Sequence, residues 1–583
     1  MDEIQKEQLR RFTEPFHEKY DENVAMLSCV ASSRGYHTFL EKGMRAHNTL
    51  ENFQYALVVF DTGQTDYYQR ALDCISKVVS LQDTDEQSET YGLWSYYLEE
   101  PLGQMNPPDW NWANFCGKIL LQIYRDYAAL LGEKLEHQVK QAIIRASASI
   151  IRRNVGPDYT NISVMGAYVT MATGELFGRT DFFSYGKWLL KRLVSFTITH
   201  GNFNEYNSPD YSVLAIEDAS LIYREIQDEE VHSMAEYVID KEWETISAHY
   251  HAPSGQWGGP QARSYNNFLT DRTKTMLQIA MGDRVVLTET PELCFQSFRF
   301  RLECPERFVS YFQSAKYTYD REFVSKGFLY PFFHMAQIAT NYNTEKFTLG
   351  SFNRSEMWAQ IRPILSYFGK KEQPACLRLR MLHDFYDFST AQLHTAQEKG
   401  NLLSVLNFAN DRGDTHVCLD MLKNASFTAK DLRIRLQIEG VSPNFRYRAD
   451  GNVLRAEQEG IHICFQVPFC KFGDFDIRFV CARQENTFCF DVVLYSGEEK
   501  LFHLNEIETA VCVMALSVSE EELPFCAARA VCCDNKINAQ WSVAGGELSV
   551  VTDSISKSWE DIFLHSREYW NGKWVVDITA NKS

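Results

Sequence analysis

The sequence lacks the features that mark exported, membrane-spanning and nucleic-acid-binding proteins. None of its apolar runs is long enough and free enough of charge to cross a bilayer, so we expect no membrane partner. Residues 1–7 are mostly charged and contain no apolar h-region, so we expect no signal peptide. The formal net charge is −19, whereas binders of nucleic acid usually carry a basic face. We therefore expect no nucleic-acid partner.

Neither the cysteine spacing nor a cofactor motif in the sequence indicates a metal or redox site. The 15 cysteines, including the adjacent Cys532 and Cys533, follow no disulfide framework, which is typical of reduced thiols in a cytoplasmic protein. His249 and His251 are two residues apart, with no further ligands at zinc spacing. The sequence contains no P-loop, no dinucleotide-binding fingerprint and no serine nucleophile elbow. We expect neither a cofactor nor a metal.

The 583 residues are too many for a single core, and the hydrophobic periodicity changes once along the chain. Residues 1–280 contain successive apolar stripes at helical spacing, including one from Trp112 to Leu130 that Gly132 interrupts. Stripes this apolar, in consecutive antiparallel hairpins without a fixed-period repeat, favour a closed (α/α) toroid. An irregular helical bundle is the alternative. The toroid would be the catalytic domain.

Residues 281–583 show the two-residue alternation that is typical of strands. Ile461, Ile463 and Phe465 alternate with His462 and its neighbours, and short runs of this kind are separated by turns such as residues 496–499. This pattern predicts an antiparallel β-sandwich. The expected fold class is therefore α+β and multidomain, with a helical toroid at 1–280 and a sandwich at 281–583.

Residues 202–211 form a polar loop between two predicted helices, and we expect a site there. Gly201 is suited to end the first helix, and Ser208 and Pro209 are suited to begin the second. Between these signals the loop carries three amides, a carboxylate and an aromatic ring. Loops carry binding groups more often than packing groups. An ordinary capped helix connection is the alternative.

Three further polar and aromatic stretches adjoin predicted helices: residues 89–100, 106–114 and 257–265. In a toroid such connections gather at one mouth, so distant residues can share a cleft. The aromatic side chains would be sugar platforms, and the amides and acids would bind hydroxyl groups, although core packing is the alternative for each tryptophan. The substrate-binding candidates from the loops are Trp94, Trp110, Trp112, Asn207 and Gln261.

The run Glu205-Tyr206-Asn207-Ser208-Pro209-Asp210-Tyr211 resembles a Glu-x-Ser-Pro-x-Tyr loop with one inserted residue. That loop occurs in polysaccharide lyases of the heparinase II/III, alginate lyase and chondroitin AC lyase type, which also combine a toroid with a sandwich. The resemblance implies that Tyr211 transfers the proton and that Asn161 helps to neutralise a uronate. It also implies a sandwich-domain histidine, for which His334 is the candidate. Ser212 stands where the family often has histidine.

β-Elimination requires that the charge of a carboxylate be neutralised, so that the adjacent proton becomes acidic enough to leave. Asn161, Gln261 and Arg263 have side chains suited to this task. A tyrosine can then act first as base and afterwards as acid, if a nearby cation lowers its pKa from about 10. Tyr211 is the first candidate and Tyr265 the second. A packed tyrosine is the alternative for both, and it is the favoured interpretation for Tyr265.

Two other functions are open. A glycoside hydrolase on the same toroid would need a carboxyl pair, for which the loops offer Glu205, Asp210, Asp109 and Glu89. A non-catalytic sugar-binding protein is the third reading. The expected partner in every case is an oligosaccharide, and the sequence sets no oligomeric state. The catalytic candidates for the lyase are Tyr211, Asn161, Glu205, Arg263 and Tyr265.

Overall fold

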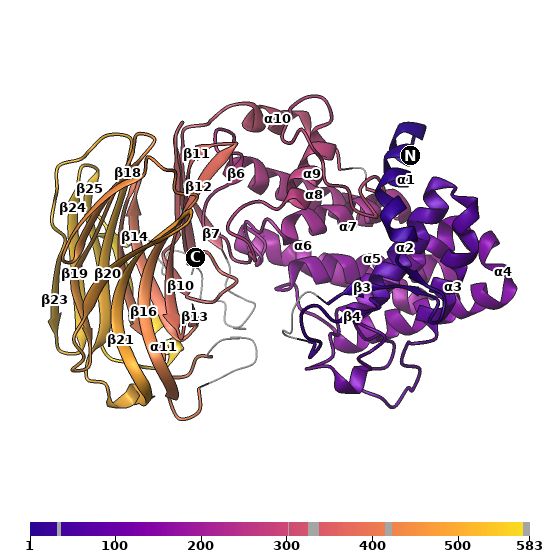
Figure 1. Ribbon diagram of the computed structural model, residues 1–583, viewed down its shortest axis with the longest axis horizontal. Helices are drawn as coiled ribbons and strands as arrows, with labels where there is room; N and C mark the ends of the chain where they lie inside the picture. The colour runs from indigo at the N-terminus through magenta and orange to yellow at the C-terminus, as the bar shows by residue number, and fades with distance from the viewer. Residues whose placement is uncertain (32–36, 301, 325–336, 414–421, 575–583) are drawn as a thin grey trace. The chain divides into compact units, whose positions relative to one another are not determined.

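The structure is a computed structural model that describes residues 1–31, 37–300, 302–324, 337–413 and 422–574 (Figure 1). Its contacts divide the chain into two compact units. The first comprises Met1–Thr199, Val213–Glu242 and Asp271–Cys304, and the second comprises His200–Ser212, Trp243–Thr270 and Pro305–Ser583. The second unit therefore includes two segments from the predicted helical half, and both belong to polar stretches of the sequence.

Helices make up most of the first unit, and a few helices lie in the second unit. Residues 160–174 of α5 are buried at every position, so this helix lies at the centre of its neighbours. Gly132 has a φ of +69° inside α4 and kinks it, which is the interruption that the sequence predicted. The helices are α1 (Glu3–His17), α2 (Thr49–Thr62), α3 (Tyr68–Val79), α4 (Trp112–Arg153), α5 (Thr160–Phe177), α6 (Thr180–His200), α7 (Tyr211–Glu225), α8 (Glu229–His249), α9 (Asp271–Met281), α10 (Glu306–Gln313) and α11 (Trp559–His565).

Short antiparallel strand pairs accompany these helices. They are β1 (Tyr20–Asp21) with β2 (Met26–Leu27), β3 (Cys29–Val30) with β4 (Arg45–Ala46), and β5 (Tyr250–His251) with β6 (Gln256–Trp257). The last pair closes a hairpin directly after α8, and the chain runs from it into residues 258–265.

The strand-rich part of the second unit contains three antiparallel sheets. The nine-stranded sheet has the order β20-β21-β16-β12-β11-β9-β8-β7, with β13 beside β12. Its strands are β7 (Thr318–Val324), β8 (Gln337–Asn343), β9 (Thr348–Phe352), β11 (Ile364–Lys370), β12 (Gln373–His383), β13 (Tyr386–Asp387), β16 (Ser426–Glu439), β20 (Arg478–Gln484) and β21 (Thr487–His503).

The other two sheets complete the stack. The seven-stranded sheet has the order β10-β14-β15-β22-β19-β18-β17, and β23 to β27 form a five-stranded sheet in sequence order. Their strands are β10 (Arg354–Glu356), β14 (Ala391–Glu398), β15 (Asn401–Phe408), β17 (Arg446–Asp450), β18 (Val453–Gln458), β19 (Ile461–Phe472), β22 (Ala510–Ser519), β23 (Arg529–Cys533), β24 (Lys536–Val543), β25 (Gly546–Asp553), β26 (Arg567–Trp570) and β27 (Lys573–Trp574).

The seven-stranded sheet is the middle layer of this stack, and its strands β14, β15 and β22 are buried on both faces. Leu402 of β15 belongs to the core shared with the nine-stranded sheet, and Leu403 belongs to the core shared with the five-stranded sheet. Successive side chains of a strand point to opposite faces, so a strand covered on both faces buries nearly all of its side chains. The predicted fold class, helices followed by an antiparallel sandwich, is confirmed, with a third sheet added.

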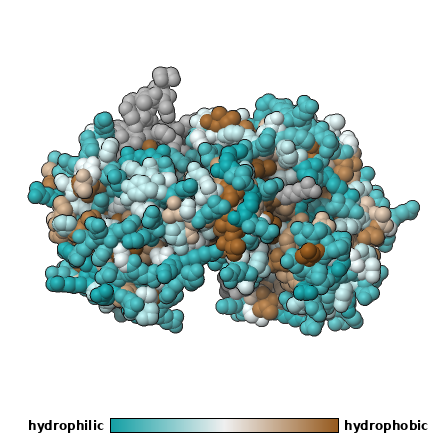
Figure 2. Space-filling model, turned by 90° about the horizontal axis from the view of Figure 1, so that it is seen from above, coloured by the Kyte–Doolittle hydropathy of each residue, from teal (hydrophilic) through white to brown (hydrophobic). Residues whose placement is uncertain are grey.

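Hydrophilic residues predominate on the face of the molecule in Figure 2, and hydrophobic residues occur among them in small groups. Isolated hydrophobic residues on a surface are ordinary in globular proteins. Within the part of the chain that the structure describes, no helix has the length and apolar character that a bilayer crossing needs.

The middle layer makes a stability prediction for Leu403, which is fully buried. Leu403→Ala removes packing between the middle and outer sheets and leaves a cavity, so we expect a loss of about 2–5 kcal/mol in the free energy of unfolding. Leu501→Ala is the matched control, because Leu501 is 53% exposed, and it should change stability by less than about 0.5 kcal/mol. Urea unfolding of the second unit measures both, and equal effects would contradict the buried middle layer.

Candidate active site

The polar loop of residues 202–210 leaves α6 at His200 and enters α7 at Tyr211. Gly201 has a φ of +83°, as expected for a residue that ends a helix. Ser208 caps the second helix, because its Oγ accepts a hydrogen bond from the backbone N–H of Tyr211 at 3.1 Å. This cap fixes Tyr211 in the first turn of α7, next to the loop.

Asn207 holds the loop to the segment that follows β6. It has a φ of +52°, a left-handed conformation that asparagine tolerates better than most residues. Its Nδ2 donates to the carbonyl oxygens of Gly258 (2.8 Å) and Pro260 (3.0 Å), and its Oδ1 accepts from Trp257 Nε1. The side chain is buried and its polar atoms are used within the protein. The prediction that Asn207 binds substrate is therefore wrong, and its role is to hold the loop.

Residues 261–264 run between the polar loop and the residues that precede β11. Backbone hydrogen bonds join Gln261 to Arg362 in both directions, at 2.9 and 3.1 Å, and the N–H of Ala262 donates to the oxygen of Tyr206 at 3.0 Å. Gln261 itself is buried, and its Nε2 donates to the Trp257 oxygen at 2.9 Å. Its Oε1 has no hydrogen-bond partner within the described residues, and substrate binding by the Gln261 side chain stays a prediction. The pairing places the next residues, Arg263 and Tyr265, beside Tyr211.

Tyr211 and Tyr265 form a hydrogen-bonded pair of hydroxyl groups. Their oxygens are 2.5 Å apart, and Arg263 Nη2 donates to the Tyr211 oxygen at 3.3 Å. The N–H of Tyr265 donates to Asp210 Oδ2 at 2.9 Å, which ties the second tyrosine back to the polar loop. Tyr265 is 53% exposed, so the alternative of a packed tyrosine is wrong for this residue. The pair combines one solvent-accessible and one largely enclosed hydroxyl.

Arg263 connects the tyrosine pair to a buried carboxylate. Its guanidinium carbon lies 5.1 Å from the ring centroid of Tyr211 and 5.1 Å from that of Trp358, within the range of cation–π attraction. Its Nη1 is 3.5 Å from Glu205 Oε1. Four of the predicted catalytic residues, Glu205, Tyr211, Arg263 and Tyr265, thus form one contiguous cluster, and their catalytic roles stay predictions.

The environment of Tyr211 differs from the expectation that a cation lowers its pKa. Burial raises the pKa of Tyr211 far above the usual value, and the hydroxyl of Tyr265 and the carboxylate of Glu205 raise it further. Arg263 opposes these effects and lowers it, but burial is the largest contribution. Tyr211 is therefore protonated at neutral pH, and its phenolate is a strong base whenever it forms.

The neighbouring Tyr206 is enclosed and bonded to a histidine. Its hydroxyl lies 2.9 Å from Nε2 of His249, whose Nδ1 lies 2.8 Å from the oxygen of Thr245. A carbonyl only accepts, so Nδ1 carries the proton and Nε2 accepts from Tyr206. Burial raises the pKa of Tyr206 well above its usual value. Tyr206 is thus a fixed support of the loop, since it also packs on Phe352 of β9.

The remaining candidates fall outside this cluster. Trp94 is fully buried, packs edge-on against Phe53 and donates from Nε1 to the oxygen of Val78 at 2.9 Å, so its prediction as a sugar platform is wrong. Trp110, Trp112 and Asn161 lie in the first unit. The two tryptophans are half-buried, and their assignment to substrate stays a prediction, as does that of Asn161. His334 lies outside the described residues.

Sequence reasoning missed Trp358 and Arg362. Trp358 is buried and lies against the Arg263 guanidinium, and Arg362 pairs with Gln261 through the backbone. Both occur in residues 357–362, a short connection with neither helical nor strand periodicity. The tryptophan and the arginine four residues later were a weak signal, because a single aromatic residue in a connection is more often core than site.

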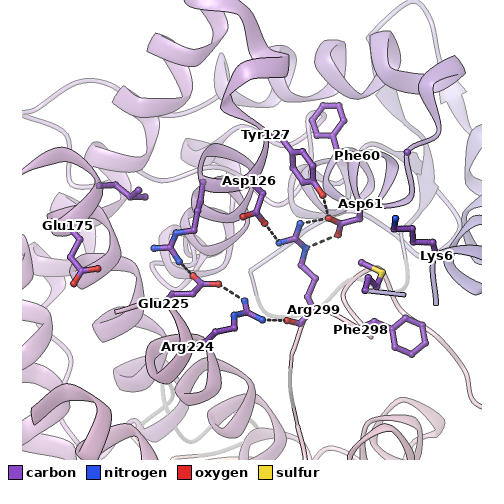
Figure 3. Close-up of a pocket in the computed structure, with 14 residues that line it drawn as sticks. Lys6, Phe60, Asp61, Asp126, Tyr127, Glu175, Arg224, Glu225, Phe298 and Arg299 are labelled. Atoms are coloured by element: carbon purple, nitrogen blue, oxygen red, sulfur yellow. Dashed lines mark hydrogen bonds and ion pairs between the residues drawn. The ribbon is translucent and has the colours of Figure 1, made fainter. Parts of the chain in front are cut away.

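A cavity of about 930 Å³ lies in the first unit, and none of the predicted site residues lines it (Figure 3). Most of its charged side chains pair with one another. Arg299 donates to Asp61 and Asp126, each at 2.7 Å, and Arg125 pairs with Glu225. Figure 3 shows Arg299 pointing at both carboxylates. Because these charges are paired with one another, they are less available to a ligand than the hydroxyl groups of the tyrosine cluster, although the cavity is large.

Comparisons with known proteins place part of this chain beside a family without an assigned function. Residues 20–285 match the family model "Domain of unknown function (DUF8769)", and no curated protein matches the chain. Solved structures that are similar include a crystal structure of heparinase III, with 10% identity, a TM-score of 0.41, and coverage of 86% of this chain and 82% of that one. Another is a mutant heparan sulfate lyase from Pedobacter heparinus, with 10% identity, a TM-score of 0.32, and coverage of 87% and 82%. At these identities and TM-scores the likeness says nothing about activity.

Asn207 makes the second stability prediction. Asn207→Gly keeps the left-handed conformation and loses three side-chain hydrogen bonds, so we expect about 2–4 kcal/mol less stability. Asn207→Ala loses the same bonds and also strains the backbone, which should cost about 1 kcal/mol more. Urea unfolding gives the order, and an alanine variant as stable as the glycine variant would contradict the assigned backbone conformation.

Proposed function

We propose that the chain is a lyase that cleaves uronate-containing oligosaccharides by β-elimination, with Tyr211 moving the proton. The observation that carries this proposal is the contact of the Tyr211 hydroxyl with the Tyr265 hydroxyl at 2.5 Å and with Arg263 Nη2 at 3.3 Å. A hydroxyl held between a cation and a second hydroxyl can give up a proton and take it back, which is the requirement for one group acting as base and acid.

The proposed reaction needs no external reactant. The phenolate of Tyr211 takes the proton from the ring carbon that bears the carboxylate. The electron pair of that C–H bond forms a double bond to the neighbouring carbon, and the bond from this carbon to the glycosidic oxygen breaks. The leaving oxygen then takes the proton from Tyr211, which restores the phenolate. The products are a saccharide with a free hydroxyl and one with an unsaturated uronate at its end.

Arg263 supplies the positive charge that this sequence requires. Its hydrogen bond to the Tyr211 oxygen stabilises the phenolate, and its position between two aromatic rings keeps the guanidinium in place. Glu205 contacts the same guanidinium, so it orients the cation and limits the net charge of the cluster. Both residues thus set how readily Tyr211 ionises. Asn161 as a further group on the substrate carboxylate remains part of the proposal.

The hydrolase alternative is less well supported by the carboxylates of the loop. Glu205 is 2% exposed and ion-paired with Arg263, and Asp210 accepts the Tyr265 N–H. A general acid of a glycosidase needs a raised pKa, whereas a cation beside a carboxylate favours its ionised form. The cytoplasmic location predicted from the sequence is part of the proposal, with imported oligosaccharides as substrate.

Tyr211→Phe separates the two mechanisms. The substitution keeps the ring and removes the hydroxyl, so we expect turnover to fall by about 10²–10⁴-fold with little change in affinity. The readout is the ultraviolet absorbance of the unsaturated product, supported by mass measurement of whether water is added. Tyr447→Phe is the control, because Tyr447 is a half-exposed tyrosine on β17, and it should retain full activity.

Glu205→Gln completes this comparison. In the lyase it weakens the positioning of Arg263 and lowers turnover partially. Full activity in Tyr211→Phe together with an inactive Glu205→Gln would reject the lyase in favour of the hydrolase.

The raised pKa of Tyr211 predicts a pH dependence. Below its pKa, the phenolate fraction increases tenfold for each unit of pH, so kcat/KM should rise about tenfold per unit between pH 6 and 9 without a plateau from Tyr211. Arg263 lowers the pKa of Tyr211, so Arg263→Met should reduce the rate at every pH in this window and keep the slope. A flat profile in the unmodified protein would contradict a phenolate base.

A further inference from the structure

A second cavity, of about 510 Å³, adjoins the tyrosine pair within the second unit. Tyr265 and Asn267 line it together with Arg362, Arg378, Asp387 and Glu439. Tyr265 therefore belongs both to the proton-transfer cluster and to this cavity. The backbone pairing of Gln261 with Arg362 makes the connection rigid, since it joins the segment that carries Arg263 to the wall of the cavity.

Arg362 is a buried cation that makes no ion pair with any of the residues that the structure describes. It is 4% exposed, and its Nη1 donates to the backbone oxygens of Ala359 (2.6 Å) and Ile361 (3.3 Å). Its Nε has no hydrogen-bond partner within the described residues. Burial lowers the pKa of Arg362. A guanidinium at this depth usually has a carboxylate or another anion beside it.

Arg378 is the second unbalanced cation. Its neighbour on the same face of β12, Arg380, is neutralised by Asp387 through two hydrogen bonds of 2.8 and 2.6 Å. The guanidinium group of Arg378 makes no ion pair or hydrogen bond in the described part of the chain, and its Nε is buried. Burial and the guanidinium groups of Arg380 and Arg362 lower the pKa of Arg378 to about 10. Its surroundings thus oppose its charge.

The acidic groups of the cavity do not compensate for both cations. Asp387 is bound to Arg380, and Glu439 Oε2 accepts from Asn267 Nδ2 at 2.6 Å. The hydroxyl of Tyr367 donates to the backbone oxygen of Asn267 at 2.5 Å, which fixes the residue that holds Glu439. Arg380 offsets the charge of Asp387, so Glu439 is the one lining carboxylate left to offset Arg362 and Arg378, and one positive charge remains in excess.

We propose that this cavity binds a small oxyanion, a sulfate or carboxylate group carried by the saccharide, through Arg362 and Arg378. Guanidinium groups present paired N–H donors that match the oxygens of carboxylate and sulfate, and an anion here would balance the repulsion between the two cations. The assignment to a saccharide rests on the proposed function, whereas the anion site itself does not. The group bound here is distinct from the uronate at the reacting carbon, so the cavity selects oligosaccharides with a second negative charge.

Direct binding tests the site without any reaction. We would titrate the full-length protein with glucose 6-sulfate, with glucuronate and with glucose, and follow binding by calorimetry. We expect binding of at least one anionic sugar and at least tenfold weaker binding of glucose. Arg378→Gln should weaken binding of the anionic sugar tenfold or more. Arg378→Lys should have an intermediate affinity, because lysine keeps the charge and loses the paired donors.

The controls distinguish this proposal from the failure of the lyase proposal. Tyr211→Phe and Arg478→Gln, which removes an exposed arginine of β20, should both bind the anionic sugar as the unmodified protein does. Arg362→Gln is the second site variant, and circular dichroism establishes that each variant is folded. Equal affinity for glucose and both anionic sugars, or unchanged affinity in the folded Arg378→Gln and Arg362→Gln variants, would overturn the anion site. Absence of an elimination product would contradict the lyase proposal and would not affect the anion-site proposal.

The relative affinities identify the group. Tighter binding of glucose 6-sulfate assigns a sulfate site, and tighter binding of glucuronate assigns a carboxylate site. Above about pH 10 Arg378 loses its charge, so binding in the unmodified protein should weaken there.

Discussion

The amide of Asn207 is the contact on which the candidate site depends. One side chain connects the polar loop to Trp257, Gly258 and Pro260, and it does so from a backbone conformation that few residues accept. The same connection sets the path of residues 261–265, from which Arg263 and Tyr265 reach Tyr211. The geometry of this buried amide therefore helps to set the positions of the reactive groups, together with the backbone pairing of Gln261 with Arg362.

The supports behind this loop are fixed in turn by the nine-stranded sheet. Tyr206 packs against Phe352 of β9, and the backbone of Gln261 pairs with that of Arg362, just before β11. β9 and β11 are neighbours in the sheet, so both supports move as one body. Catalytic groups on loops need such a scaffold, because proton transfer demands that donor and acceptor stay within hydrogen-bonding distance.

Sequence reasoning predicted the fold better than it predicted the site. Helical stripes such as the one interrupted at Gly132, and strand alternation at Ile461 and Phe465, report burial directly, and burial follows the period of the element. The cluster of Glu205, Tyr211, Arg263 and Tyr265 was foreseeable because polar groups were dense in two loops. The sequence did not predict whether an individual side chain in these loops is exposed to solvent.

The wrong assignments have a common physical cause. Trp94 and Asn207 are residue types that often bind ligands, but their polar atoms hydrogen-bond to Val78 and to Gly258 and Pro260. The local sequence does not encode these long-range partners. Arg378 was missed for the converse reason. It alternates with apolar residues on β12, a pattern that normally indicates a solvent-exposed charge, and only the tertiary structure shows how far it is enclosed.

The buried middle sheet has a consequence for the order of folding during synthesis. β15 pairs with β14, its neighbour in sequence, and with β22, more than 100 residues later, as in the pairing of Asn401 with Ser517. Its outer face packs against β24 and β25, which come later still. Pairings so distant in sequence form slowly, and apolar strand faces are exposed until they do. The nascent chain therefore presents the outer face of β14 and β15 uncovered until β24 and β25 have been synthesised, which makes this stretch a natural substrate for chaperones.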